Sequence, residues 1–195
     1  MPALTKQKKY TPEEYLALEE KAEFRSEYEN GEIVAMAGGS LNHIKITSNI
    51  SRFIGNKASE NCFALPNEMK VRVKSLDKFY YPDVTVLCDE PQFFERKTNT
   101  ITNPVLIVEV LSKSTEARDR GEKFFAYQAL DSLREYVLIS QDKALAEQFI
   151  KQADGSWKYL ATIGLESILK LESINIELTL KEIYGRVDFR IEENL

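Results

Sequence analysis

The segment 104–113, PVLIVEVLSK, contains one acidic residue in an otherwise apolar run. An unbroken series of Val, Leu and Ile predicts a strand that is buried on both faces, in the middle of a sheet. Glu109 would then lie in an apolar interior, where an unpartnered carboxylate costs several kcal/mol. The fold must therefore supply Glu109 with a cation, a proton or a metal ion.

Length and composition predict one globular domain. A chain of 195 residues with 43% hydrophobic and 29% charged residues can bury a sizeable core. We expect a single domain over residues 1–195, with residues 1–10 flexible. No segment has the apolar length of a signal peptide or a membrane span. Because Cys62 and Cys88 show neither CxxC nor zinc spacing, we predict a cytoplasmic protein with reduced thiols and no membrane association.

The order of predicted elements indicates an α/β domain built around a mixed sheet. Helices are predicted over residues 12–21, 42–59 and 117–130, and Ile44, Thr47, Ile50, Phe53 and Ile54 form the expected buried stripe of the second. Strands are predicted over 32–37, 83–89, 104–113 and 135–140. Two hairpins are expected, one joining 61–66 to 69–74 and a C-terminal one joining 145–152 to 157–162. Residues 89–103 are predicted to be a solvated excursion, and residues 174–185 a short strand followed by a helical turn.

Asp83 is the first candidate partner for Glu109. It opens the apolar strand 83–89 directly after a proline, a position that also simply marks a strand end. If the two strands are neighbours, however, both carboxylates lie at one end of the sheet. Oxygen ligands of this kind suit Mg²⁺ or Mn²⁺.

The helix after Glu109 offers a second set of partners. Asp119, Lys123 and Tyr127 follow one another at four-residue spacing and so share one helix face. One interpretation is a surface Asp–Lys pair beside a packed tyrosine. The other returns Lys123 to the carboxylates, as a point charge on an attacked phosphate or as a base for water.

Other charged residues carry weaker signals. Glu27 and Glu29 stand in a polar segment that predicts a solvated surface, and His43, the single histidine, is typical of a helix cap or a surface residue.

Lys70, Arg72 and Lys74 alternate, so they share one face of a strand, either as the wet side of a sheet or as a surface for a phosphate backbone. The net charge of −5 argues against a sequence-independent polyanion binder but leaves a nucleic-acid enzyme open.

Taken together, these motifs resemble the Uma2 family (DUF820), which is similar to the PD-(D/E)xK restriction-endonuclease-like superfamily. The segments that carry the resemblance are YTPEEYLAL, YENGEIVAMAGGSLNH, YPDVTV, LIVEVLSKST, DRGEKFFAY and REYVLIS, in this order. The resemblance implies a restriction-endonuclease-like core, in which helices flank a central mixed sheet, with the C-terminal hairpin as an addition. It also implies a divalent-metal site in which Asp83 is the aspartate of the PD element and Glu109 is the following acid.

The sequence departs from the superfamily pattern at the lysine. Leu111 stands two residues after Glu109, where that lysine would be expected. Lys113 lies about 13 Å from Glu109 along a straight strand, so Lys123 is the preferred replacement. The resemblance also places Glu27 and His43 at motif positions, which makes both expected outer members of the site.

The resulting hypothesis is metal-dependent hydrolysis of phosphodiester bonds in DNA. Asp83, Glu109 and the Val110 carbonyl would hold one or two Mg²⁺ or Mn²⁺ ions, Lys123 would orient or deprotonate a water, and a homodimer would allow both strands to be cut. One alternative is a nuclease-like binding or scaffold module, in which Glu109 pairs with Lys123 and no metal is needed. Another is hydrolysis of a small phosphoester without affinity for polynucleotides.

Overall fold

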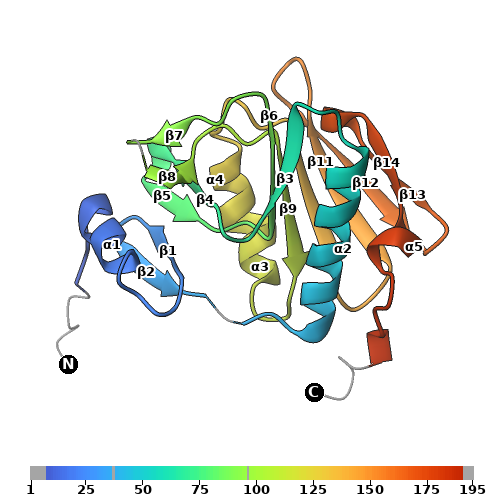
Figure 1. Ribbon diagram of the computed structural model, residues 1–195, viewed down its shortest axis with the longest axis horizontal. Coiled ribbons are helices and arrows are strands. Elements are labelled where there is room, and N and C mark those ends of the chain that lie inside the picture. The colour runs from blue at the N-terminus through green and yellow to red at the C-terminus, as the bar shows by residue number, and fades with distance from the viewer. Residues whose placement is uncertain (1–7, 37, 96, 191–195) are drawn as a thin grey trace.

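The structure is a computed structural model that describes residues 8–36, 38–95 and 97–190 (Figure 1). The predicted flexible segment 1–10 lies largely outside these residues. Two six-stranded sheets and one two-stranded sheet make up the β structure of the described part of the chain. The prediction of an α/β fold with a central mixed sheet is confirmed.

The sheet that carries Glu109 has the strand order β12-β11-β10-β9-β6-β3. Its central strand β9 (Leu106–Leu111) runs parallel to β10 (Glu135–Ser140) and antiparallel to β6 (Val84–Cys88). The outer strands are β11 (Leu145–Lys151), β12 (Trp157–Ile163) and β3 (Cys62–Pro66). The apolar run thus forms a fully buried inner strand, as predicted, and β11 and β12 form the predicted C-terminal hairpin.

The second six-stranded sheet has the order β2-β1-β5-β4-β8-β7. Its strands are β1 (Ser26–Glu29), β2 (Glu32–Ala35), β4 (Lys70–Val73), β5 (Lys78–Tyr80), β7 (Phe93–Phe94) and β8 (Lys97–Ile101). The predicted hairpin between 61–66 and 69–74 is wrong, because β3 pairs with β6 and β4 pairs with β5 and β8. The predicted solvated excursion 89–103 likewise contributes two strands to this sheet.

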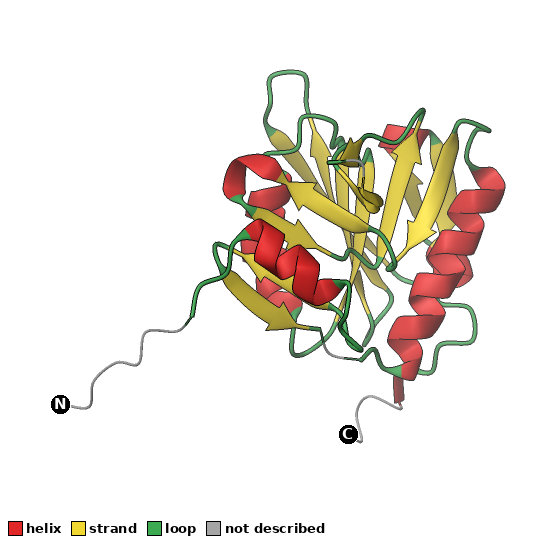
Figure 2. Cartoon of the chain, turned by 60° about the vertical axis from the view of Figure 1, so that its left-hand side comes forward, coloured by secondary structure: helices red, strands yellow, loops and turns green. Residues whose placement is uncertain are grey.

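Helices cover the Glu109 sheet on both faces. On one face lies α2 (Leu41–Lys57), which begins at the Ser40 cap and packs through Ile46, Ile50 and Ile54 (Figures 1 and 2). On the other face, α3 (Glu116–Arg118) and α4 (Phe124–Tyr127) are joined by a π-helical turn, Asp119–Lys123. Ala126, Tyr127 and Leu130 pack with residues of both sheets, so α4 lies between them.

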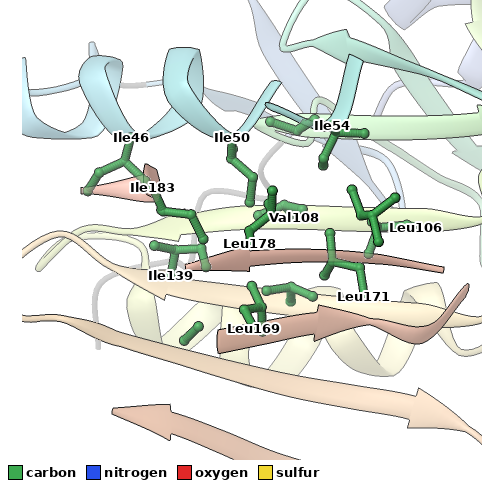
Figure 3. Packing of buried hydrophobic residues seen from close by; sticks show 14 of the residues in the cluster. Ile46, Ile50, Ile54, Leu106, Val108, Ile139, Leu169, Leu171, Leu178 and Ile183 are labelled. Atoms are coloured by element: carbon green, nitrogen blue, oxygen red, sulfur yellow. The ribbon is translucent and has the colours of Figure 1, made fainter. Parts of the chain in front are cut away.

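The remaining helices lie at the ends of the chain. Helix α1 (Pro12–Glu19) begins with the capping box of Thr11 and Glu14 and packs on β1. After the hairpin of β11 and β12, a second and separate hairpin of β13 (Ile168–Leu171) and β14 (Ile176–Thr179) leads into α5 (Leu180–Ile183). Leu169, Leu171 and Leu178 of this hairpin belong to the same apolar cluster as Ile50 and Ile54 of α2 and Val108 of β9 (Figure 3).

The cysteines differ from the expectation of reduced thiols. Cys62 of β3 stands opposite Cys88 of β6, and the two form a disulfide. The disulfide could not be predicted from the spacing of 26 residues, because it forms only when β3 pairs with β6 rather than with β4. No helix in residues 8–36, 38–95 and 97–190 has the length and apolar character needed to cross a membrane.

The predicted buried stripe of α2 is wrong at its first residue, Ile44. Ile44 is 57% exposed, whereas Ile46 and Ile50 are fully buried.

We expect Ile50→Ala to lower the free energy of unfolding by about 2–5 kcal/mol, because it leaves a cavity in the core. Ile44→Ala on the same helix should change it by less than about 0.5 kcal/mol. Urea denaturation of both variants tests this, and equal losses would contradict the burial described here.

Candidate active site

Asp83 and Glu109 lie on neighbouring antiparallel strands and are linked through the backbone. Val84 is opposite Val108, so the next pair along the two strands is Asp83 and Glu109. The Asp83 N–H donates to Oε2 of Glu109 at 3.2 Å, and the Val110 N–H donates to Oδ2 of Asp83 at 2.7 Å. The structure thus brings together the two carboxylates that the sequence places at one end of the sheet.

The other oxygen of Glu109 points toward the helix side of the sheet. Its Oε1 accepts hydrogen bonds from Lys123 Nζ at 3.1 Å and from the Tyr127 hydroxyl at 3.2 Å. The side chain is almost completely buried, and this burial raises its pKa well above the usual range despite the charge of Lys123. Glu109 is therefore partnered in the absence of a metal, but its ionised form remains costly.

Lys123 is surrounded by carboxylates. Its Nζ lies 3.1 Å from Glu27 Oε1, 3.1 Å from Glu109 Oε1 and 3.2 Å from Asp119 Oδ1. Although burial alone lowers the pKa of Lys123, the charges of these acids raise it well above its usual range. The neighbouring carboxylates therefore favour the charged form of Lys123, which fits the predicted role of a fixed cation better than that of a base for water.

The π-helical turn aligns the residues that face Glu109. In an α-helix with 3.6 residues per turn, a four-residue spacing drifts by about 40° at each step. The wider π turn, Asp119–Lys123, offsets this drift, so that Asp119, Lys123 and Tyr127 face the same strand. Tyr136 of β10 holds the turn by donating from its hydroxyl to the Asp119 carbonyl at 2.9 Å. The sequence predicted that Asp119, Lys123 and Tyr127 share one face, but it did not predict the π-helical turn that improves their alignment.

Glu27 is an inner member of the cluster. It is 2% exposed, in contrast to the solvated surface that its polar neighbours predict, and in agreement with its motif position. Its Oε1 also accepts the Tyr81 N–H at 3.1 Å, and Arg118 forms ion pairs with both Glu27 and Glu29. Sequence reasoning missed Arg118, which precedes the π turn and carries no local signal of this contact.

His43 reaches the site from the opposite side of the sheet. The Ser40 side chain accepts the His43 N–H at the start of α2, and His43 Nε2 lies 2.8 Å from Oδ1 of Asp83. Burial lowers the pKa of His43, but the hydrogen bond and charge of Asp83 outweigh this effect and raise it overall. The structure therefore joins His43 to the carboxylate pair rather than leaving it as a surface residue.

The predicted basic stripe is not a solvated face. Lys70 is 3% exposed and Arg72 is 5% exposed. The Arg72 guanidinium lies over the Phe79 ring and donates to Asp77, while Lys74 is exposed and begins a 3₁₀ turn, Lys74–Leu76. The alternation predicted that the three residues share one face, but aromatic rings lie against Lys70 and Arg72 on β4 and help to bury them.

The donor set around Asp83 and Glu109 has the chemistry of a divalent-cation site. Mg²⁺ is commonly bound through one or two carboxylates together with waters and substrate phosphates. Oε2 of Glu109 and both oxygens of Asp83 each take part in one hydrogen bond and keep a further lone pair, whereas Oε1 of Glu109 already accepts two. Among residues 8–36, 38–95 and 97–190, no three or more His, Cys, Asp or Glu side chains are arranged to hold a metal ion. The residues present thus fit a two-carboxylate site and not an all-protein cage.

Comparison with known proteins supports this assignment of the fold. The family model Uma2, described as "Putative restriction endonuclease", matches residues 12–181. The chain belongs to the Uma2 family. Two Uma2-like relatives from Synechocystis sp. (strain ATCC 27184 / PCC 6803 / Kazusa) are "Uncharacterized protein sll1609" and "Uncharacterized protein slr1290". The first is 34% identical over 85% of this chain and 94% of the relative, and the second is 36% identical over 93% and 94%.

A solved structure also resembles this Uma2 chain. It is described as "a putative nuclease belonging to DUF820 from Anabaena variabilis" and superimposes with a TM-score of 0.73, over 90% of this chain and 98% of that one. At 19% identity the likeness concerns the fold. The recognition of the Uma2 family and its nuclease-like fold from sequence motifs is confirmed, whereas the roles of the individual site residues stay predictions.

The raised pKa of Glu109 predicts a distinct dependence of stability on pH. A carboxyl whose pKa is higher in the folded state than in the unfolded chain stabilises the fold at low pH, and that contribution is lost as pH rises through the folded-state pKa. Glu109→Gln does not titrate at this position. As pH rises from 5 to 8, the free energy of unfolding of the unmodified chain should therefore fall relative to that of Glu109→Gln, because only the unmodified chain acquires a buried negative charge.

The exposed Glu122, on the π turn, gives the matched control. Glu122→Gln should follow the unmodified chain at every pH, within about 0.5 kcal/mol. Guanidinium unfolding at several pH values measures both variants. A Glu109→Gln curve parallel to that of the unmodified chain would contradict the raised pKa.

Proposed function

We propose that this Uma2 protein hydrolyses phosphodiester bonds in DNA with the help of Mg²⁺ or Mn²⁺ held by Asp83 and Glu109. The observation that carries the proposal is the interlocked carboxylate pair beside the buried ammonium of Lys123. The family's description, "Putative restriction endonuclease", supports a nucleic-acid substrate. The proposal extends that description to a particular metal site and to DNA.

The charge balance of the cluster supports cation binding. Its acids are Glu27, Asp83, Glu109 and Asp119, and its fixed cations are Arg118 and Lys123. If these six groups are ionised and His43 is neutral, their negative charge exceeds their positive charge by two, and Glu29 also shares the charge of Arg118. Such an excess is costly in a protein interior. A divalent cation beside Asp83 and Glu109 would offset this excess.

Each side chain of the cluster would have a distinct role. Asp83 and Glu109 would hold the ion with the Val110 carbonyl, and Glu27 and Asp119 would keep the Lys123 ammonium in place. The bound ion would lower the pKa of a water and neutralise charge on the phosphate. Lys123 would stabilise negative charge as it develops on the phosphate, and His43 would fix the orientation of Asp83.

A specific observation also favours the alternative of a binding or scaffold module without turnover. Lys123 already pairs with Glu109 at 3.1 Å, as that alternative requires, and this pairing satisfies the carboxylate without any metal. The two functions differ in whether the protein turns over a substrate. In the nuclease, two sites in a homodimer would serve the two strands of a duplex.

We expect Lys123→Ala to abolish Mn²⁺-dependent nicking of supercoiled plasmid DNA, because no other ammonium touches Glu109 among the described residues. Loss of one preorganised charge of this kind typically costs about 10²–10³ in rate. Lys113→Ala is the matched control and should retain activity, since Lys113 lies beyond the end of β9.

Activity that depends on Lys113 instead would show that the catalytic lysine is assigned to the wrong residue. An unmodified protein that binds DNA but never cleaves it in Mg²⁺ or Mn²⁺ would support the scaffold module. Metal-dependent cleavage of a small phosphodiester, with no affinity for DNA, would exclude DNA as the substrate.

A further inference from the structure

Strand β12 is an open edge of the Glu109 sheet. It pairs with β11 along all seven of its residues, and no strand in the described part of the chain pairs with its other side. Its row of outward backbone N–H and C=O groups is therefore available to another chain. Proteins normally protect such edges with charges, prolines, bulges or short strands.

In the described part of the chain, the other edge strands of the two six-stranded sheets are shorter. At the opposite edge of the same sheet, β3 has five residues and ends in Pro66. In the second sheet the edge strands are β2, with four residues, and β7, with two. By contrast, β12 has seven residues, WKYLATI, with no proline and a single charge at Lys158. Its pairing with β11 is regular from end to end.

Exposed apolar side chains also gather at this edge. Tyr159 is 51% exposed, Leu160 is 36% exposed and Ile163 is 70% exposed. Leu165, in the turn after the strand, and Ile168, at the start of β13, are 42% and 56% exposed. Exposed apolar side chains on both faces of an unpaired edge strand favour an interaction site there.

We propose that β12 pairs with β12 of a second copy of this chain, in antiparallel orientation, to form a two-fold symmetric dimer with a continuous sheet. Along an edge strand, every second residue directs its backbone N–H and C=O groups toward the open edge. In an antiparallel pair, two residues that stand opposite each other either both direct these groups toward the partner strand or both direct them away from it. Under two-fold symmetry the axis must therefore pass between a residue and its own copy. Leu160 is the centre of Trp157–Ile163, and only this register pairs all seven residues.

The side chains suit this register. Leu160 meets itself across the axis, Lys158 meets Thr162, Tyr159 meets Ala161 and Trp157 meets Ile163. The only charged residue of the strand therefore faces a threonine rather than its own copy, which matters because like charges directly opposite each other destabilise a strand pair. Trp157 and Tyr159 are already held by Phe124 and Phe149, so they present a rigid apolar surface to the partner.

The partner is a second copy rather than an unrelated peptide because the edge is complementary to itself. A stable dimer typically buries about 1,200–2,000 Å² in total, and Leu165 and Ile168 add apolar surface to that of the strand. None of these residues belongs to the carboxylate cluster. The inference is therefore independent of the proposed chemistry, although it would supply the two sites that cutting a duplex requires.

A cysteine on the axis tests the register. Leu160→Cys should form a disulfide-linked dimer on mild oxidation, because residues directly opposite in an antiparallel pair have Cβ atoms about 4.5–5.5 Å apart. Cys62 and Cys88 are already bonded to each other, so the new thiol has no partner within its own chain. Thr162→Cys is the matched control and should remain monomeric, since its two copies would lie about 13 Å apart along the strands. Combining Lys158→Cys with Thr162→Cys should restore the cross-link.

Sedimentation velocity tests the dimer without a cross-link. The unmodified full chain should sediment as a dimer, and Leu160→Lys should shift it to the monomer, because two ammonium groups would meet on the axis. Phe125→Lys, at a position of α4 that is 67% exposed, should leave the dimer intact. A monomeric unmodified chain, a dimer insensitive to Leu160→Lys, or equal cross-linking of Leu160→Cys and Thr162→Cys would each overturn the proposal.

Discussion

The ammonium group of Lys123 is the interaction on which the candidate site depends. Three buried carboxylates from three different elements meet it: Glu27 from β1, Glu109 from β9 and Asp119 from the π turn. Removing one member of a buried charge cluster typically costs about 3–5 kcal/mol, because the remaining charges lose their partners. The two sheets and the helix between them are therefore joined by charge as well as by apolar packing.

Burial of β9 determines the chemistry of this cluster. Alternate residues of the strand pack on α2 and on α4, so both faces exclude water. The same burial that stabilises the sheet makes the ionised form of Glu109 costly and confines its partners to the side chains that α4 and the second sheet provide. Asp83 is also buried, but less completely, with 9% exposure against 2% for Glu109. The ion that we propose would therefore approach the pair from the Asp83 side.

Much of this could be predicted from the sequence because the signals were local. The apolar run specified an inner strand, the single acid in it demanded a partner, and four-residue spacing put Lys123 and Tyr127 on the facing helix side. Pairings between distant segments left no such signal. The partner of β3 and the disulfide that follows from it depend on β3 joining β6 in the Glu109 sheet. The burial of Lys70 and Arg72 depends on a second sheet whose strands come from separate parts of the chain.

Smaller errors had the same origin. Ile44 fits a helical stripe as well as Ile46 does, and only the position of the sheet below α2 decides between them. Glu27 looked solvated because its neighbours are polar, whereas Lys123 and Arg118 bury it from more than ninety residues away in the sequence. Local pattern therefore predicted most of the elements and several members of the carboxylate cluster, and tertiary pairing determined their contacts.

The central claim is that Asp83 and Glu109 share a divalent cation, and Mn²⁺ binding measured by isothermal titration calorimetry tests it most directly. The unmodified chain should bind Mn²⁺, Asp83→Asn and Glu109→Gln should each lose that binding, and Glu122→Gln should retain it. Calorimetry requires no knowledge of the substrate, so the result is independent of which nucleic acid is cut. Absence of Mn²⁺ binding by the unmodified chain, or binding that survives in both carboxylate variants, would contradict the account.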